Sequence, residues 1–232
     1  MLEDAVQEPK KRFKKRYFVL LPLVVLVFMY KDFIFPSTWN YKVTVEIETP
    51  NGTGASYAVR QIKARFSPAV LPEMADVEYE VIGEAVVLEL GEQTVAYLIM
   101  SGTPIFEFFK AFPVSGDIKS NRQKMKYYRS LSVGTEGRIN SAPHKLVYFK
   151  DTEDPTSLDV FDSDQIKVKS ITYQITNEPV TKNIYKYLDD GSAYGPNIFG
   201  SGYREFIQWL KTLTYGDNKR VGLNQFSRGE LK

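Results

Sequence analysis

A cluster of basic residues followed directly by an apolar run constrains this chain more than any other feature. Residues 10–16 include six basic side chains: Lys10, Lys11, Arg12, Lys14, Lys15 and Arg16. The 14 residues from Tyr17 to Tyr30 carry no charge, and residues 33–35 extend the apolar character further. A basic cluster beside the most apolar segment of a chain is typical of a membrane-inserting segment. We therefore expect the N-terminus to enter a membrane.

This run has three interpretations: a cleaved signal peptide, a retained anchor or a buried core helix. Its uninterrupted length suits a signal peptide, because a bilayer core of about 30 Å needs about 20 helical residues. However, residues 28–33 are bulky or charged where a peptidase needs small side chains, and Lys31 can extend its ammonium group to the interface. We predict a retained anchor over residues 17–35. Its predicted membrane contacts are Tyr17, Phe18, Leu20, Leu23, Val24, Leu26, Phe28 and Tyr30.

The basic cluster also predicts the orientation of the chain. Lys and Arg beside a membrane helix stay in the cytoplasm, which places residues 1–16 inside and residues 36–216 beyond a bacterial inner membrane, in the periplasm or outside the cell. Cysteine is absent, which excludes a lipidated cysteine and disulfides. Residues 17–232 hold 24 basic and 25 acidic side chains, so the net charge of +2 comes from the terminus and predicts no nucleic-acid partner.

Beyond residue 36, the spacing of apolar residues predicts mainly strands. Val43, Val45 and Ile47 alternate with polar residues over 41–48, as in a strand with one wet face. Six consecutive apolar residues, 95–100, predict a central strand covered on both faces. Similar patterns predict further strands over 57–66, 77–81, 85–90, 145–150 and 166–176, with bulges near 60–61 and 169–170.

Three segments have helical spacing, namely 103–112, 120–131 and 203–213. We therefore predict an α+β fold, mainly antiparallel and sandwich-like, with about seven strands and two or three helices. One transmembrane helix precedes it. Residues 36–216 are predicted to form one extracytoplasmic domain, and residues 217–232 a polar C-terminal tail.

The densest group of acidic residues lies in the loop Asp151-Thr152-Glu153-Asp154-Pro155. Calcium requires oxygen ligands at short spacing, which makes Asp151, Glu153 and Asp154 candidate metal ligands. The order does not match an EF-hand, since Thr156 stands where that loop needs glycine. Asp and Ser also form solvated turns. The loop is therefore interpreted either as a calcium site or as a turn.

A second candidate surface combines basic and aromatic side chains. Such a surface can bind an anionic polysaccharide, or it can be the solvated face of a helix. The residues concerned are Lys119, Arg122, Lys124, Lys126 and Arg129, interleaved with Tyr127 and Tyr128. His144 is the only histidine, which leaves zinc sites and a Ser-His-Asp mechanism without their usual partners. No residue is assigned a catalytic role, and no cofactor is predicted.

Three stretches resemble a known group of proteins: WNYKVTVEIETPNG from residue 39, LVYFKDTEDPTSLDVFD from residue 146, and ITYQITNEPVTKNI from residue 171. They are similar to an uncharacterised family of small bacterial envelope proteins, anchored by an N-terminal helix or a lipid and without an assigned activity. That family continues with Leu-Pro-Trp-Leu where this chain has Tyr187-Leu188-Asp189-Asp190. The resemblance implies an envelope location and assigns no site residue.

Together these features predict a single-pass membrane-anchored envelope protein. Its β-rich part is expected to be an interaction or structural module whose partners are envelope proteins, met through sheet edges or through the aromatic surface around the last helix. One alternative is an envelope hydrolase that uses carboxylates, with calcium at the acidic loop as an option. The other is a module that binds cell-wall polysaccharide.

Overall fold

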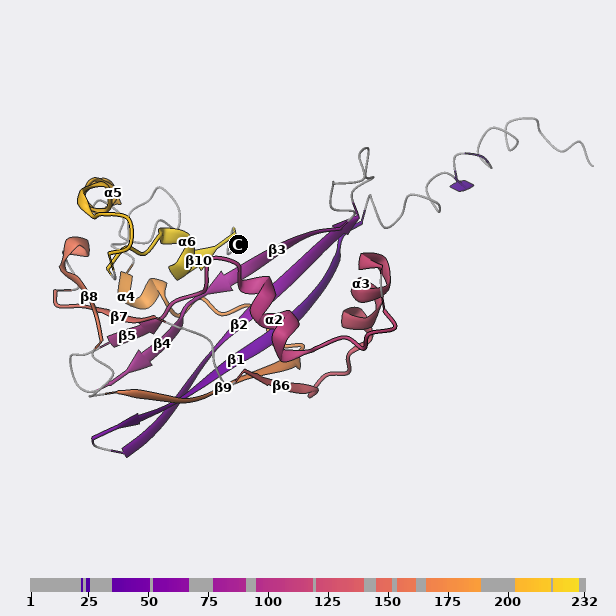
Figure 1. Cartoon of the computed structure of the whole chain (residues 1–232), viewed down its shortest axis with the longest axis horizontal. Helices are drawn as coiled ribbons and strands as arrows, with labels where there is room; N and C mark the ends of the chain where they lie inside the picture. The colour runs from indigo at the N-terminus through magenta and orange to yellow at the C-terminus, as the bar shows by residue number, and fades with distance from the viewer. Residues whose placement is uncertain are drawn as a thin grey trace, which may run out of the picture.

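The computed structural model describes residues 22, 24, 25, 35–50, 52–66, 77–90, 95–118, 120–139, 145–151, 154–161, 166–188, 203–217 and 219–229. In this part of the chain, ten strands form two sheets and are accompanied by five α-helices (Figure 1). Every described strand pair is antiparallel. The predicted class, α+β with mainly antiparallel strands, is confirmed. There are more strands than the seven expected and more helices than the two or three expected.

The larger sheet has six strands in the spatial order β10-β3-β2-β1-β9-β6. These are β1 (Ser37–Thr49), β2 (Gly52–Phe66), β3 (Val77–Glu84), β6 (Glu136–Ile139), β9 (Lys167–Thr176) and β10 (Ser227–Arg228). All 13 residues of β1 pair with β2, which makes this hairpin the centre of the sheet. β3 pairs only with residues 61–66 of β2, so the far half of the hairpin projects beyond β3 (Figure 1).

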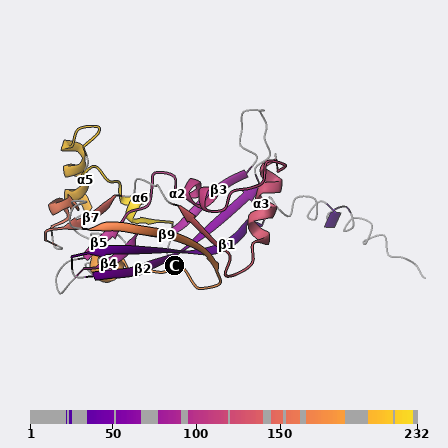
Figure 2. The same ribbon diagram turned by 60° about the horizontal axis from the view of Figure 1, so that its bottom comes forward.

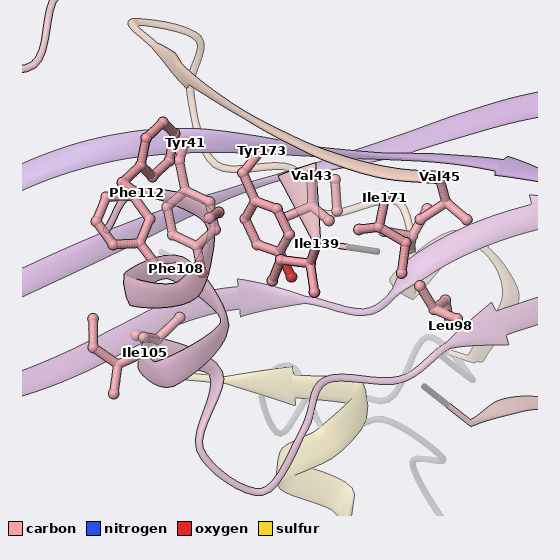
Figure 3. Packing of buried hydrophobic residues seen from close by; sticks show 14 of the residues in the cluster. Tyr41, Val43, Val45, Leu98, Ile105, Phe108, Phe112, Ile139, Ile171 and Tyr173 are labelled. Atoms are coloured by element: carbon pink, nitrogen blue, oxygen red, sulfur yellow. The ribbon is translucent and has the colours of Figure 1, made fainter. Parts of the chain in front are cut away.

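The main hydrophobic core lies against one face of the larger sheet. Tyr41, Val43 and Val45 alternate along β1 and are 0–1% exposed, as the period of two in a strand requires. Figure 3 shows them in one row with Tyr173 of β9, and Phe108 lies beside Tyr41, with ring centroids 5.1 Å apart. Burying each such side chain contributes about 1.5–3 kcal/mol relative to leaving it exposed. The predicted first strand with one wet face is confirmed.

The smaller sheet is covered on both faces. It has four strands in the order β4-β5-β7-β8, namely β4 (Val86–Glu89), β5 (Val95–Leu98), β7 (Leu146–Phe149) and β8 (Leu158–Val160). Ala96 and Leu98 belong to the core beneath the larger sheet, whereas Tyr97 belongs to a second core on the opposite face. The prediction of a central strand covered on both faces is confirmed for β5.

Two helices follow the hairpin of β4 and β5. α2 (Pro104–Ala111) starts with a proline, whose ring suits the first helical turn, and packs Phe108 against the inner face of the larger sheet. α3 (Asn121–Ser130) starts with a capping box formed by Ser120 and Gln123. Both segments were predicted as helices. α3 lies at the opposite end of the molecule from α5 (Tyr203–Thr212) in both views (Figure 1, Figure 2).

The second core lies between the smaller sheet and the C-terminal half of the chain. α4 (Tyr185–Leu188), α5 and α6 (Leu223–Phe226) contribute Leu188, Phe206 and Phe226 to it. The 3-10 turn η1 (Pro155–Ser157) leads into β8. Because helices cover this face, β7 and β5 carry apolar residues on both sides.

Residues 217–232 were predicted as a polar tail, and the described part of that segment packs into the fold. Val221 and Phe226 are fully buried. The main-chain oxygen of Phe226 accepts a hydrogen bond from the N–H of Ala85 at 2.7 Å, and that of Gln225 accepts one from Met100 at 2.8 Å. Arg228 donates to the main-chain oxygen of Gly102 at 2.8 Å. This segment therefore ties both sheets together.

The two predicted bulges have different outcomes. The register between β1 and β9 shifts between Glu46 and Ile47, opposite Lys169, which confirms the second bulge. The register between β1 and β2 is continuous, so the bulge near residues 60–61 is wrong. The alternation of apolar residues indicated a bulge because a charged residue, Arg60, occupies an inward position of the strand. Arg60 is only 2% exposed, and its Nε donates to the main-chain oxygen of Glu84 at 2.9 Å.

Most of the predicted membrane anchor and all of the basic cluster lie outside the described residues. Of the predicted contact residues only Val24 is described; it is helical and 52% exposed. None of the described helices has the length and apolar character needed to cross a membrane.

Candidate binding cleft

A cleft of about 360 Å³ lies between the projecting half of the β1–β2 hairpin and the smaller sheet. The hairpin contributes Ile47 and residues 54–56, and β4 contributes residues 87–89. The segment around α4 supplies Asn183 and residues 186–187. Clefts that bind ligands commonly have volumes of about 300–1,000 Å³, so this one falls within the range.

The path of the chain explains the cleft. β3 ends at Glu84 and β4 begins at Val86, so the chain leaves the larger sheet and enters the smaller one within two residues. β2 extends well past the end of β3, from residue 60 back to residue 52. On the side away from β1, this half of β2 therefore lies beside β4 of the smaller sheet rather than beside β3.

Glu84 holds the wall of the cleft in place. Its side chain is fully buried, and its carboxylate accepts hydrogen bonds from the main-chain N–H groups of Asn183 at 2.9 Å and Ile184 at 2.8 Å. A buried carboxylate is tolerated when hydrogen bonds satisfy it. Because both donors directly precede α4, Glu84 positions that helix against the cleft.

The main chain of β2 is open along one side. Val59 directs its N–H to the side-chain hydroxyl of Thr181 at 3.1 Å, and its oxygen accepts from the N–H of Thr181 at 3.2 Å. Both groups therefore point away from β1. Main-chain direction alternates along an antiparallel strand, so Ala55 and Tyr57 also point their N–H and C=O groups away from β1. In the described part of the chain, no strand pairs with that side of residues 52–58.

The edge of β4 faces the same cleft. The hydroxyl of Ser56 donates to the main-chain oxygen of Val87. Ala85, two residues earlier, directs its N–H to Phe226, away from β5. The same alternation turns the main chain of Glu89 towards the cleft. Two strand edges from different sheets thus meet across it.

Charged groups of both signs stand at the rim. The hydroxyl of Tyr187 donates to the carboxylate of Glu89, and Lys186 lies 3.1 Å from that hydroxyl and 3.6 Å from the carboxylate. The Tyr187 hydrogen bond and then the Lys186 charge lower the pKa of Glu89. The pKa of Lys186 is raised by the same hydroxyl and by Glu89. Near neutral pH the rim therefore presents one anion and one cation.

The cleft lining supplies binding groups rather than a catalytic pair. Glycoside hydrolysis needs two carboxyl groups about 5–9.5 Å apart. Glu89 is the single carboxylate among the described lining residues. The remaining polar groups are main-chain amides, hydroxyls, the side-chain amide of Asn183 and one ammonium, which bind by hydrogen bonds and charge.

The described part of the acidic loop is held by hydrogen bonds of its own residues. The carboxylate of Asp154 accepts from the N–H and the hydroxyl of Thr156, at 2.8 and 2.7 Å, and so caps η1. The N–H of Asp151 donates to the hydroxyl of Ser157 at 3.0 Å. Glu153 lies outside the described residues. Across the described chain, no three acidic or histidine side chains are grouped as metal ligands would be.

The basic stretch lies on α3, and its aromatic residues face inward to different degrees. Tyr128 is 2% exposed and stacks on Phe109, with ring centroids 4.9 Å apart. Tyr127 is partly buried against the same core. The guanidinium of Arg122 lies over the ring of Phe66, 5.1 Å from its centroid. Of the two aromatic rings, only Tyr127 is thus partly open to a ligand; Lys119 and His144 lie outside the described residues.

No family model matches the chain, and neither a curated protein nor a solved structure does.

Proposed function

We propose that this chain is a single-pass protein of the bacterial inner membrane, with its N-terminus in the cytoplasm and its β-rich part in the periplasm or outside the cell. The support for anchoring is the basic cluster of residues 10–16 beside the apolar segment of residues 17–35. The β-rich part acts as a binding module for envelope proteins. The support for binding is the cleft where two strand edges meet.

The cleft is the observation that carries this function. It offers outward main-chain groups at Ala55 and Glu89, an apolar floor at Ile47, and rim charges at Lys186 and Glu89. These groups recognise a ligand without transforming it. A single carboxylate in the described lining also favours binding over carboxylate-based hydrolysis.

The anchor is tested in cells. A reporter enzyme that is active only outside the cytoplasm is fused after Lys232, and the membrane fraction is washed at high pH. We expect an active reporter and a protein that leaves the membrane only with detergent. A mature N-terminus beyond about residue 30, the end of the apolar run, would contradict the anchor.

The binding role is tested by photo-crosslinking in the same cells. A photoreactive residue replaces Lys186 at the cleft rim, and a control replaces Lys126 on α3. Both lysines are exposed, and only Lys186 lines the cleft. We expect one envelope protein to be captured from position 186 and not from position 126. Equal capture from both positions would refute a specific role of the cleft.

A further inference from the structure

The geometry points to an extended polypeptide segment as the occupant of the cleft, added as a new strand to residues 53–57 of β2. This inference rests on the binding function proposed above and names the partner by its chemistry. The edge presents an N–H and a C=O at every second residue, with Ala55 at its centre.

Only another main chain matches that edge along its length. Outward groups recur every two residues, about 6.6–6.8 Å apart, and a complementary ligand needs alternating donors and acceptors at the same spacing. An extended peptide has this repeat, and strand addition is a known mode of peptide recognition. The open stretch of five residues spans about 16 Å, which accommodates a short segment.

The sequence of the open edge allows this pairing. Edges of native sheets are usually protected by lysines, prolines, bulges or short length. Residues 52–57 read GTGASY, with no charge and no proline. The terminal strands of the two sheets are short: β4 and β6 have four residues each, β8 three and β10 two. Residues 77–82 of β3 pair with a strand on one side only, but they carry the charges of Glu78 and Glu80. Among the described strands, β2 thus combines length with an unprotected edge.

Gly54 leaves room for a side chain of the added strand. It pairs with Ile47 on β1 and lines the cleft, and an added Cβ would lie 3.7 Å from Cγ1 of Ile47, an ordinary contact. The floor next to it is formed by Ile47 and Leu88, which are apolar. The partner segment therefore directs a small apolar side chain towards Gly54.

The test uses the full chain in detergent and a displayed library of linear peptides of about ten residues, long enough to exceed the edge. The tightest peptide is labelled, and its affinity is measured by fluorescence anisotropy. A copy of this peptide with N-methyl groups at alternate residues is the matched probe, because methylation removes the donors that a strand needs.

Two variants at one position isolate the outward N–H. Ala55 is exposed, and its N–H points away from β1, so Ala55→Pro removes that donor without removing a bond of the hairpin. Ala55→Val keeps the donor. We expect Ala55→Pro to weaken peptide binding about tenfold, the effect of one hydrogen bond, and Ala55→Val to leave it unchanged. Thermal unfolding of both variants verifies that the fold is intact.

A third variant fills the space beside Ile47 at the base of the cleft. Gly54→Val places a β-branched side chain where the partner's side chain would lie, in a strand position that favours such residues. We expect peptide binding to be lost and the unfolding temperature to stay the same or rise.

The outcomes separate this inference from the proposed function. Loss of binding with Ala55→Pro, with Gly54→Val and with the methylated probe establishes strand addition. Peptide binding that survives Ala55→Pro and methylation, yet competes with crosslinking from position 186, overturns strand addition and leaves the binding function standing. If the library yields no specific peptide, strand addition is overturned. If position 186 also gives no crosslinks in cells, the proposed binding function is overturned too.

Discussion

Among the half-open edges of the larger sheet, those of β9 and β2 are protected differently. β9 pairs with β6 only from residue 171, so residues 167–170 have one side without a strand in the described part of the chain. This stretch carries Lys167 and Lys169 and contains a bulge. The opposite edge, residues 53–57 of β2, has no charge and a regular register.

This difference teaches that exposure alone does not identify a binding edge. Lysines and bulges prevent unwanted strand addition at an edge that has to stay open to solvent. β9 has both devices, whereas β2 has neither and faces a cleft with an apolar floor. The unprotected edge is therefore the one that a partner can use, and four changes test this contrast.

The largest effect is expected from removing the carboxylate of Glu84, which holds the segment before α4 against the cleft. Glu84→Ala leaves the N–H groups of Asn183 and Ile184 without their acceptor and should lower the free energy of unfolding by about 2–4 kcal/mol, with loss of peptide binding. Glu80→Ala, on the same strand but exposed and 3.4 Å from Lys63, is the control and should cost less than about 1 kcal/mol. Urea unfolding measures both. An equal loss of unfolding free energy in both variants would show that Glu84 does not hold the segment before α4 in place.

The second change adds lysines to the β2 edge, like those that protect the β9 edge. Thr53→Lys with Ala55→Lys adds two charges at exposed positions. We expect peptide affinity to fall at least about tenfold, because desolvating a lysine or losing one strand hydrogen bond has this effect. The unfolding curve should not move. Unchanged affinity would mean that the peptide does not pair with this edge.

The third change removes protection from the β9 edge. Lys167→Thr with Lys169→Thr leaves a neutral strand rich in β-branched residues, and the lost ion pair of Lys169 with Glu46, at 4.0 Å, is weak. We expect self-association to increase severalfold, as seen by analytical ultracentrifugation. A double variant with the wild-type oligomeric state would show that the bulge alone protects β9.

The smallest effect is expected at β8, an edge closed by ion pairs. Asp159 lies 2.7 Å from Lys150 and 3.1 Å from Lys219, and hydrogen bonds from these lysines, Lys150 first, lower its pKa from 3.8 to about 2. Because the folded-state pKa is lowered, this stabilisation is complete above about pH 4 and is lost as the pH falls from about 4 towards 2. Urea midpoints measured across this range should fall more for the wild type than for Asp159→Asn. Parallel curves would contradict the assignment.

Local patterns predicted most of the elements. β1, β3 and β5 follow from alternation or from an apolar run, and α2 follows from its first-turn proline and helical spacing. Short elements were missed, among them β6, β8 and α4, because three or four residues contain too little periodicity to be recognised. Val221 and Phe226 were assigned to a tail because two apolar residues among polar neighbours resemble a solvated segment, although both are fully buried.

The cleft was not predictable from its residues. Sheet edges were expected to meet partners, yet Ser56, Glu89 and Lys186 belong to no motif and are far apart in the sequence. Residues 52–57 differ from the lysine-bearing stretch of β9 in charge, which is a signal that the sequence contains. Its meaning depends on which side of each strand is left unpaired, and that is a tertiary fact.

Periodicity was sufficient for the class of the fold and for the first strand, because apolar spacing acts over a few neighbouring residues. The N-terminal anchor stays a prediction. Tertiary structure decided that Arg60 faces inward, that Glu84 anchors the segment before α4, and that β2 extends past β3 to meet β4. Each of these depends on partners between 24 and 100 residues away along the chain. Such contacts form only when the sheets pack, since no local pattern encodes which strand ends lie side by side.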